Sequence, residues 1–246
     1  MNSGQGAIRF VTTCLTVTFP FMAAAVFALP SPSGSAERQK ATNEDLRAGE
    51  TQSPKLTTRG ERIDATPDKK ALVRALRQGG YVLYFRHAIT DRSRIDADRT
   101  NLRNCATQRN LSHEGRQQAK AIGKAIQALG LAIGEVLTSP YCRCIDTANL
   151  TFGKFTVSTD LIWVLGQPEA ESQRLAQALR TRLGTRPSKG TNTVLVSHTA
   201  NLKEAVGMWP EPEGALYIFL PGADGGTSYV GKIAPEEWAT LTPTEE

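Results

Sequence analysis

The sequence lacks a long lysine and arginine block, and it has no basic stripe with interleaved aromatic side chains. Such patches are the electrostatic footprint of proteins that bind nucleic acid, so we expect no nucleic-acid partner. The net charge of +5 over 246 residues fits a protein that meets anionic ligands, as it fits many others. With 40% hydrophobic and 22% charged residues, the composition predicts about one globular domain plus extensions.

Cysteine is scarce and forms no metal-binding pattern. The pair Cys142-x-Cys144 has no partner ligand cluster in the sequence, which disfavours a metal site there. Cys14 lies in an apolar N-terminal segment, so Cys105, Cys142 and Cys144 remain for the main body of the chain. In an oxidising compartment we expect one disulfide, which joins Cys105 to either Cys142 or Cys144.

The N-terminal segment has no charged residue between Phe10 and Leu29, and Arg9 is the only positive charge before it. Small residues follow up to Ala36, so residues 1–36 resemble a secretory signal that is cleaved after Ala36. The apolar run is also about as long as the ~20 residues that span a bilayer, so an uncleaved membrane anchor at residues 10–29 fits nearly as well. Both interpretations predict an exported protein, periplasmic or secreted.

Residues 37–65 contain almost no large apolar side chains. Such a segment cannot bury enough surface to offset the entropy of ordering it, and we interpret it as a disordered linker. The folded domain is then expected to span residues 66–246. Thr66 as N-cap and Pro67 at the first helical position predict that the domain opens with a helix.

Two strands are predicted to end in histidine. The apolar run Tyr81–Phe85 follows two glycines, reads as a buried strand, and leads directly into Arg86 and His87. The β-branched run Thr193–Ser197 leads in the same way into His198. In open α/β sheets ligands bind beyond the carboxyl ends of the strands, so this is where we expect the chemistry.

The remaining elements alternate in an α/β order. We expect a strand at residues 135–139, a hairpin formed by residues 215–220 and 228–233, and helices after Ser112 and at residues 141–152, 169–183 and 199–206. Arg143 falls in the first turn of the helix that Pro140 opens, where free backbone N–H groups and a guanidinium make a ready anion site. His113 is expected to be a surface residue.

The connection after His87 is long, polar and rich in arginine. It carries five arginines among several aspartates, at positions Arg92, Arg94, Arg99, Arg103 and Arg109. Long connections without apolar periodicity are more often functional than accidental. The alternative is a solvated loop with internal ion pairs.

The motifs, taken in order, resemble those of the histidine phosphatase superfamily, the phosphoglycerate-mutase-like proteins. They are Arg86-His87-Ala88-x-Thr90, Leu111-Ser112-x-x-Gly115, Thr138-Ser139-Pro140-x-x-Arg143-x-x-x-Thr147-Ala148 and Val194-Leu195-Val196-Ser197-His198. Their order and their strand-end context make the resemblance specific. It implies an α/β fold, a three-layer α/β/α sandwich around a mostly parallel central sheet.

The resemblance also implies phosphoryl transfer through a phosphohistidine. His87 would be the nucleophile, while Arg86, Arg143 and His198 would hold the phosphoryl oxygens. Arginine forks and a second histidine can stabilise the transferred group without a metal, so we expect no metal and no cofactor. Thr90, Arg92 and Arg94 are expected to bind the substrate, and the loop arginines suggest a second anionic group on it.

The proton donor for the leaving oxygen is harder to assign. Many members of the superfamily have a glutamate after the strand that follows the Arg143 helix, but here Trp163 stands at that point. We favour Glu213, because a Glu-Gly pair in this loop faces the pocket in some exported-type relatives. The other candidates are Glu211, Glu169 and Asp91.

These inferences predict an exported phosphatase that hydrolyses a phosphomonoester through a phosphohistidine, independently of metal. The alternatives are a phosphomutase of the same superfamily, and a phosphate-binding or sensing protein without an effective acid. The partner is expected to be a phosphorylated small molecule. The sequence leaves its identity and the oligomeric state open.

Overall fold

The computed structural model describes residues 68–241. In chain order the elements are α1 (Lys69–Gln78), β1 (Val82–Arg86), α2 (His113–Ala128), β2 (Ile133–Thr138), α3 (Cys142–Phe152), β3 (Thr156–Val157), α4 (Glu169–Gly184), β4 (Asn192–Ser197), α5 (Thr199–Val206), β5 (Leu216–Pro221), β6 (Thr227–Ile233) and α6 (Trp238–Leu241). The predicted signal or anchor at residues 1–36 and the predicted linker at 37–65 lie outside the described residues. Within residues 68–241, no helix is both long and apolar enough to cross a bilayer.

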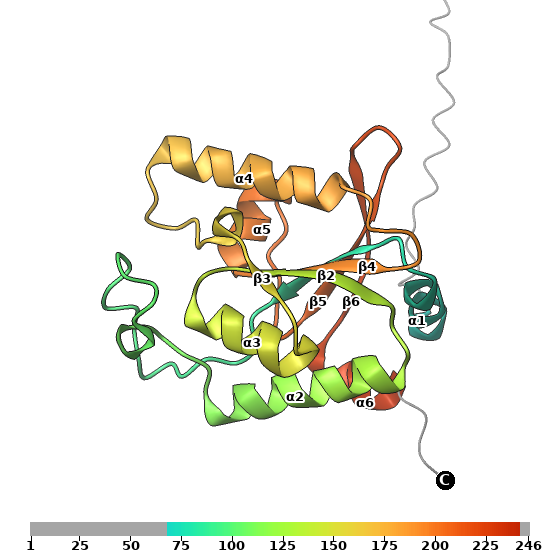
Figure 1. Ribbon diagram of the computed structural model, residues 1–246, viewed down its shortest axis with the longest axis horizontal. Coiled ribbons are helices and arrows are strands. Elements are labelled where there is room, and N and C mark those ends of the chain that lie inside the picture. Colours follow the sequence, from blue (N-terminus) through green and yellow to red (C-terminus); the bar gives the residue numbers. More distant parts are fainter. Residues whose placement is uncertain (1–67, 242–246) are drawn as a thin grey trace, which may run out of the picture. The chain divides into compact units, whose positions relative to one another are not determined.

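The six strands form one sheet in the order β3-β2-β4-β1-β5-β6. The pairings from β3 through β2 and β4 to β1 are parallel, whereas β5 and β6 are added in antiparallel fashion. Helices α2 and α3 cover one face of the sheet, and α4 and α5 cover the other (Figure 1). The α/β fold with three layers and a mostly parallel sheet is therefore confirmed.

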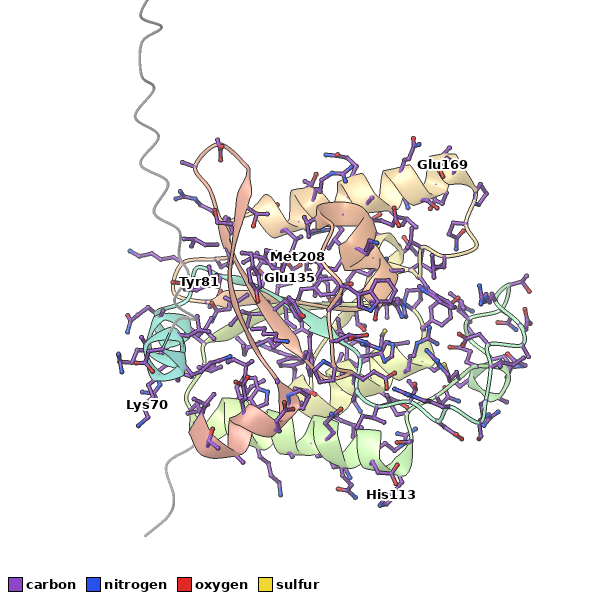
Figure 2. The ribbon with its side chains drawn as sticks, turned by 180° about the vertical axis from the view of Figure 1, so that it is seen from behind. Lys70, Tyr81, His113, Glu135, Glu169 and Met208 are labelled. Atoms are coloured by element: carbon purple, nitrogen blue, oxygen red, sulfur yellow. A yellow bond between two sulfur atoms is a disulfide. The ribbon has the colours of Figure 1, made fainter. Side chains whose placement is uncertain are left out.

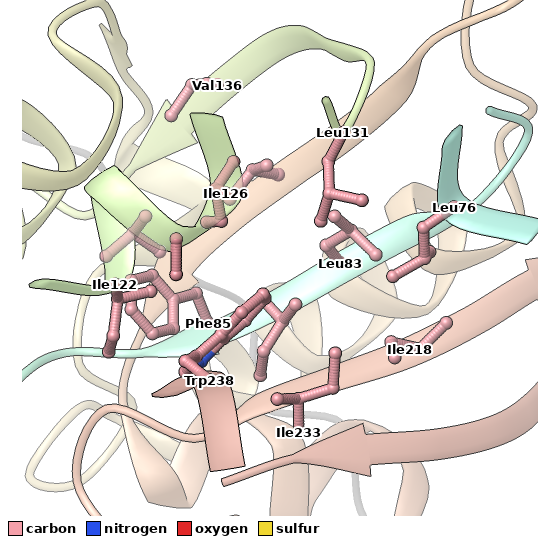
Figure 3. Packing of buried hydrophobic residues seen from close by; sticks show 14 of the residues in the cluster. Leu76, Leu83, Phe85, Ile122, Ile126, Leu131, Val136, Ile218, Ile233 and Trp238 are labelled. Carbon is pink, nitrogen blue, oxygen red and sulfur yellow. The ribbon is translucent and has the colours of Figure 1, made fainter. Parts of the chain in front are cut away.

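The alternation of side chains along β1 builds the two cores. Leu83 and Phe85 point to the side of α2 and α3, where they pack with residues from α1 and with Trp238 of α6 (Figure 3). Val82 and Tyr84 point to the opposite core beneath α4 and α5. Each large apolar side chain that is fully buried in this way stabilises the fold by about 1.5–3 kcal/mol. With both faces covered, β1 is held rigidly up to its polar end.

Most predicted elements lie within a residue or two of the observed ones, but the first N-cap is wrong. Asp68, not Thr66, caps α1, since its carboxylate accepts hydrogen bonds from the backbone N–H groups of Lys70 and Ala71. Consequently Pro67 precedes the cap instead of opening the helix. Ser112 caps α2 as predicted and accepts from the N–H of Gly115.

Two short elements have no counterpart among the predictions. The strand β3 is two residues long and exposed, so it has no alternating pattern that could be recognised. The helix α6 has four residues, and its single buried side chain, Trp238, joins the α2 side of the core. Both lie at edges of the fold.

Candidate active site

The strand register brings the two strand-end histidines together. Arg86 of β1 lies opposite Ser197 of the parallel strand β4, and the N–H of His87 donates to the carbonyl of Ser197 at 3.1 Å. His87 and His198 therefore leave the sheet side by side, with ring centroids 5.6 Å apart. Both side chains are buried. The loop that follows β1 extends from this edge (Figure 1, green).

The hydrogen bonds of His87 define which ring nitrogen is free. Its Nδ1 lies 3.0 Å from the carbonyl oxygen of Ala88, and because a carbonyl can only accept, Nδ1 carries the proton. The lone pair is then on Nε2. The backbone N–H of Ala88 donates to Thr147 Oγ1, whose hydroxyl donates to the carbonyl of Arg143. Thr147 of α3 thus fixes the backbone of Ala88, the residue that follows His87.

His198 lies in a pocket of aromatic and polar groups. Arg143 Nη2 is 3.4 Å from its Nδ1, so Nδ1 accepts and Nε2 donates to Ser139 Oγ at 2.9 Å. Tyr141 and Trp163 stand around the ring, with centroids 5.1 Å and 6.2 Å from it. Trp163 is therefore a wall of the site at the point where the resemblance leads one to expect a glutamate.

Both buried histidines are neutral near pH 7. Burial is the main cause that lowers the pKa of His87 and of His198 well below the usual value, and the positive charge of Arg143 lowers both further. A neutral imidazole with its lone pair on Nε2 is the form that can attack an electrophile. The thiol of Cys144 is 3.7 Å from His198 Nε2, but burial raises its pKa to about 12 and keeps it protonated.

Arg143 is paired with a carboxylate from the arginine-rich loop. Its Nη1 donates to both carboxylate oxygens of Asp96, at 3.0 and 3.2 Å, and the two side chains are 1% and 4% exposed. The buried pair directs Nη2 toward His198. Asp96 is one of several aspartates of this loop, and nothing in the local sequence indicates its partner 47 residues away.

Glu213 reaches the site from the loop after α5. It is 6% exposed, and its Oε1 accepts from Thr90 Oγ1 at 2.8 Å while lying 3.8 Å from Arg86 Nη2 and 4.0 Å from His87 Nδ1. Its Oε2 is 3.8 Å from Nη2 of Arg92, whose side chain is largely exposed. The structure thus brings Glu213, Thr90 and Arg92 together beside His87. Backbone geometry supports this position, since Gly214 has a φ of +88° and its N–H donates to the carbonyl of His87.

The other predicted acids and Arg94 are engaged elsewhere. Glu211 accepts from Trp209 Nε1, and Glu169 at the start of α4 accepts from Gln173. The Ser93 hydroxyl donates to Asp91 and lowers the pKa of that carboxyl, which disfavours the protonated form that a general acid needs. The guanidinium of Arg94 donates to the carbonyl of Ala106 within its own loop. His113 lies at the outer surface, as expected (Figure 2).

A disulfide attaches the arginine-rich loop to α3. Cys105 is bonded to Cys142, with 5.7 Å between the Cα atoms, and Cys144 is left as a free, buried thiol. This decides between the two pairings that the sequence left open. Beside the disulfide, the buried Gln108 side chain accepts from the N–H of Cys142. The disulfide and this hydrogen bond both end at Cys142, the residue before Arg143.

A cleft of about 600 Å³ opens next to Glu213. Thr90, Arg92 and Glu213 line it together with residues from the start of α2. Gly115 allows α2 to approach so closely, since a Cβ atom there would meet the carbonyl oxygen of Ile89 at 1.9 Å. Glu213 lies both on this cleft and 4.0 Å from His87 Nδ1, so the cleft adjoins the histidine pair.

Three arginines at this end of the sheet have an unsatisfied donor. Within residues 68–241, six buried side-chain polar atoms have no hydrogen-bond partner, and three are the Nε atoms of Arg86, Arg109 and Arg143. A buried N–H group without a partner costs about 1–3 kcal/mol. Three such donors at one site are suited to bind an anion, which would supply their acceptors. In the same part of the chain, no three His, Cys, Asp or Glu side chains are grouped so as to hold a metal ion.

Fold and site together define an α/β protein with two buried, neutral histidines in an arginine-lined anion pocket. Residues 82–162 match the family model of the Histidine phosphatase superfamily (branch 1). The resemblance read from the motifs is thereby confirmed over this segment.

The solved structures with a similar fold include three phosphatases. A protein from Escherichia coli proposed to be an alpha-ribazole-5'-P phosphatase has a TM-score of 0.50 at 12% identity, over 64% of this chain and 98% of that one. A phosphoserine phosphatase from Entamoeba histolytica has a TM-score of 0.46 at 16% identity, over 63% of this chain and 96% of that one. A mycobacterial glucosyl-3-phosphoglycerate phosphatase has a TM-score of 0.45 at 16% identity, over 61% of this chain and 97% of that one. No curated protein matches the chain.

The buried neutral histidines predict a specific loss of stability in acid. In the unfolded chain a histidine takes up its proton near pH ~6.5, whereas the folded protein resists protonation of His87 and His198. The unfolded state therefore binds more protons below pH ~6.5, and the free energy of unfolding falls as the pH drops, by up to about 1.4 kcal/mol per pH unit for each histidine.

Urea unfolding at several pH values between about 5.5 and 7.5 measures this slope. We expect His198→Gln to flatten it and His113→Gln, at the exposed position, to leave it unchanged. Equal slopes for wild type and His198→Gln would show that His198 is not held neutral in the folded state.

Proposed function

We propose that this protein is a phosphatase that transfers a phosphoryl group to Nε2 of His87 and then to water. The observation that carries the proposal is the buried neutral His87, whose Nδ1–H donates to the carbonyl of Ala88 and whose ring lies 5.6 Å from that of His198. The bond that forms joins Nε2 to phosphorus as the ester oxygen leaves, and water then attacks phosphorus to regenerate the lone pair. The match to the family model and the fold support a phosphatase in general. That the substrate is a phosphomonoester is our inference.

The arginines and His198 would stabilise the charge on the phosphoryl oxygens. Arg86 and Arg143 each bring a buried Nε–H without a protein acceptor, and His198 stands between Arg143 and Ser139. Donors that are already oriented at developing charge lower the barrier without reorganisation, and removal of one such donor typically costs about 10²–10³-fold in rate. This chemistry needs no metal, so we expect turnover to persist in EDTA.

Glu213 would supply the proton for the leaving oxygen. Its carboxyl lines the 600 Å³ cleft and lies 4.0 Å from His87 Nδ1, so a leaving group that extends into the cleft would meet it. A carboxyl group beside His87 favours a phosphatase over a sensing protein. Thr90, which donates to Oε1, would hold the carboxyl in place.

The experiment compares Glu213→Gln with wild type on two substrates, an activated aryl phosphate and an alkyl phosphate with a poor leaving group. Loss of the general acid is expected to lower kcat about 10²-fold or more for the alkyl ester and much less for the aryl ester, whose oxygen leaves without a proton. Equal losses on both would reassign Glu213 to orienting His87. No turnover of either ester by wild type would sink the phosphatase proposal.

We also propose that the protein is exported. The Cys105–Cys142 disulfide supports this, because such bonds persist in oxidising compartments. The apolar segment at residues 10–29 supports it independently, as a cleaved signal or as an anchor.

A further inference from the structure

We propose that Arg109 is a third guanidinium on the transferred phosphoryl group, beside Arg86 and Arg143. The inference rests on the proposed phosphatase function and adds a residue to its site. The sequence predicts that Arg109, like the other loop arginines, binds a second anionic group of the substrate. In the structure its backbone is instead bonded to Asp96 and Arg143.

The backbone of Arg109 is fixed against the Asp96–Arg143 pair. Its N–H donates to Asp96 Oδ1 at 2.9 Å, and its carbonyl accepts from Arg143 Nη1 at 3.4 Å. The next residue, Asn110, accepts at its carbonyl from the N–H of Asp91, and Thr90 bridges Leu111. Arg109 therefore stands on a segment held between the start of the loop and the start of α3.

The guanidinium of Arg109 has no partner among the described residues. Its Nε is buried, and among residues 68–241 the guanidinium makes no hydrogen bond or ion pair. Arg143, in contrast, is paired with Asp96, and Arg86 donates to the carbonyl of Pro210 and faces Glu213. A ligand that supplied an acceptor would account for the buried donor of Arg109.

The charge of Arg109 acts on the reacting groups. Burial and Arg143 are the main causes of the lowered pKa values of His87 and His198, and the positive charge of Arg109 lowers both further. It acts on Arg86 as well, where it adds to the effect of burial. The backbone contacts of Arg109 to Asp96 and Arg143 hold this charge beside the guanidinium that faces His198.

The ion pairs of the site leave Arg109 without a carboxylate partner. Arg143 is paired with Asp96, while Arg86 and Arg92 each lie 3.8 Å from an oxygen of Glu213. Among residues 68–241, Arg109 makes no ion pair. Since the Arg92 side chain is 81% exposed, Arg109 is the more buried of the two loop arginines beside the site.

Titration calorimetry of the full chain with inorganic phosphate tests the assignment. Phosphate has no second anionic group, so any effect reports on the phosphoryl site alone. We expect Arg109→Ala to weaken binding about 10- to 100-fold, the size of a lost charge-assisted pair of hydrogen bonds. Arg103→Ala removes the same charge from an exposed position of the same loop and should change affinity less than about twofold.

The melting temperature separates this effect from unfolding. Because the Arg109 side chain has no partner among residues 68–241, Arg109→Ala should melt within about 2 °C of wild type. Arg109→Lys keeps the charge without the planar fork and is expected to bind phosphate with intermediate affinity. Arg109→Ala with wild-type phosphate affinity, or a lysine variant no better than alanine, would overturn the assignment.

The binding readout also separates this inference from the proposed function. Phosphate affinity that depends on Arg109 in a protein without turnover would refute the phosphatase and leave Arg109 in the anion site. If turnover depends on His87 but Arg109→Ala leaves the phosphate affinity unchanged, the phosphatase proposal stands and the assignment of Arg109 is refuted.

Discussion

His87→Ala is expected to lower kcat/KM for an activated aryl phosphate by about 10⁴-fold or more. The substitution removes the one ring nitrogen that the structure presents as a free lone pair in the arginine-lined pocket. The remaining donors could still bind phosphate and polarise it. They have no nucleophile to offer, and the direct attack of water lacks the proximity that a covalent intermediate provides.

His113→Ala is the matched control for this substitution. The chain has only three histidines, and His113 lies exposed on the first turn of α2, away from the pair that the register of β1 and β4 brings together. We expect unchanged turnover. Turnover by His87→Ala within tenfold of wild type would remove His87 from the nucleophile's role.

Arg143→Ala is expected to lower the free energy of unfolding by about 3–5 kcal/mol and the rate of hydrolysis by about 10²–10³-fold. Both effects come from one geometry. Without Arg143 the carboxylate of Asp96, 4% exposed, keeps its charge in a buried place with only the N–H of Arg109 as donor. The guanidinium that points at His198 is lost at the same time.

A double-mutant cycle with Asp96→Ala separates the two effects. Because removal of both partners leaves no isolated charge, the double variant should be less destabilised than the sum of the two single variants. Its activity should stay low, since the phosphoryl oxygens still lack Arg143. Chemical denaturation and aryl phosphate kinetics measure the two quantities. Additive stability losses would show that Asp96 and Arg143 do not depend on each other.

The sequence was most informative where local pattern and chemistry coincide. The apolar runs before His87 and His198 predicted two buried strands, and the parallel pairing of β1 with β4 turned that pattern into a pair of adjacent imidazoles. Ser112 predicted the start of α2, because a cap acts within one turn. The helix α3 begins at Cys142 after its N-cap Tyr141, one residue later than predicted, so Pro140 precedes the cap. The placement of Arg143 followed from the start of α3.

The loop contacts could not be predicted in this way. Asp96, Arg109 and Glu213 lie in connections without periodicity, and each reaches the site through contacts that span tens of residues. Glu213 was favoured through the family resemblance alone. The sequence likewise narrowed the disulfide to two pairings, and only the packing of the loop on α3 distinguishes Cys142 from the buried Cys144.

Chemical trapping of the phosphoenzyme tests the central claim most directly. Wild-type protein is mixed with a radiolabelled phosphomonoester that it hydrolyses, quenched in alkali within its turnover time, and digested for peptide mapping. A phosphoryl group on the imidazole of His87, stable in alkali and lost in acid, is the predicted result. Label on a different residue, or turnover with no trapped label under the same quench, would contradict the account.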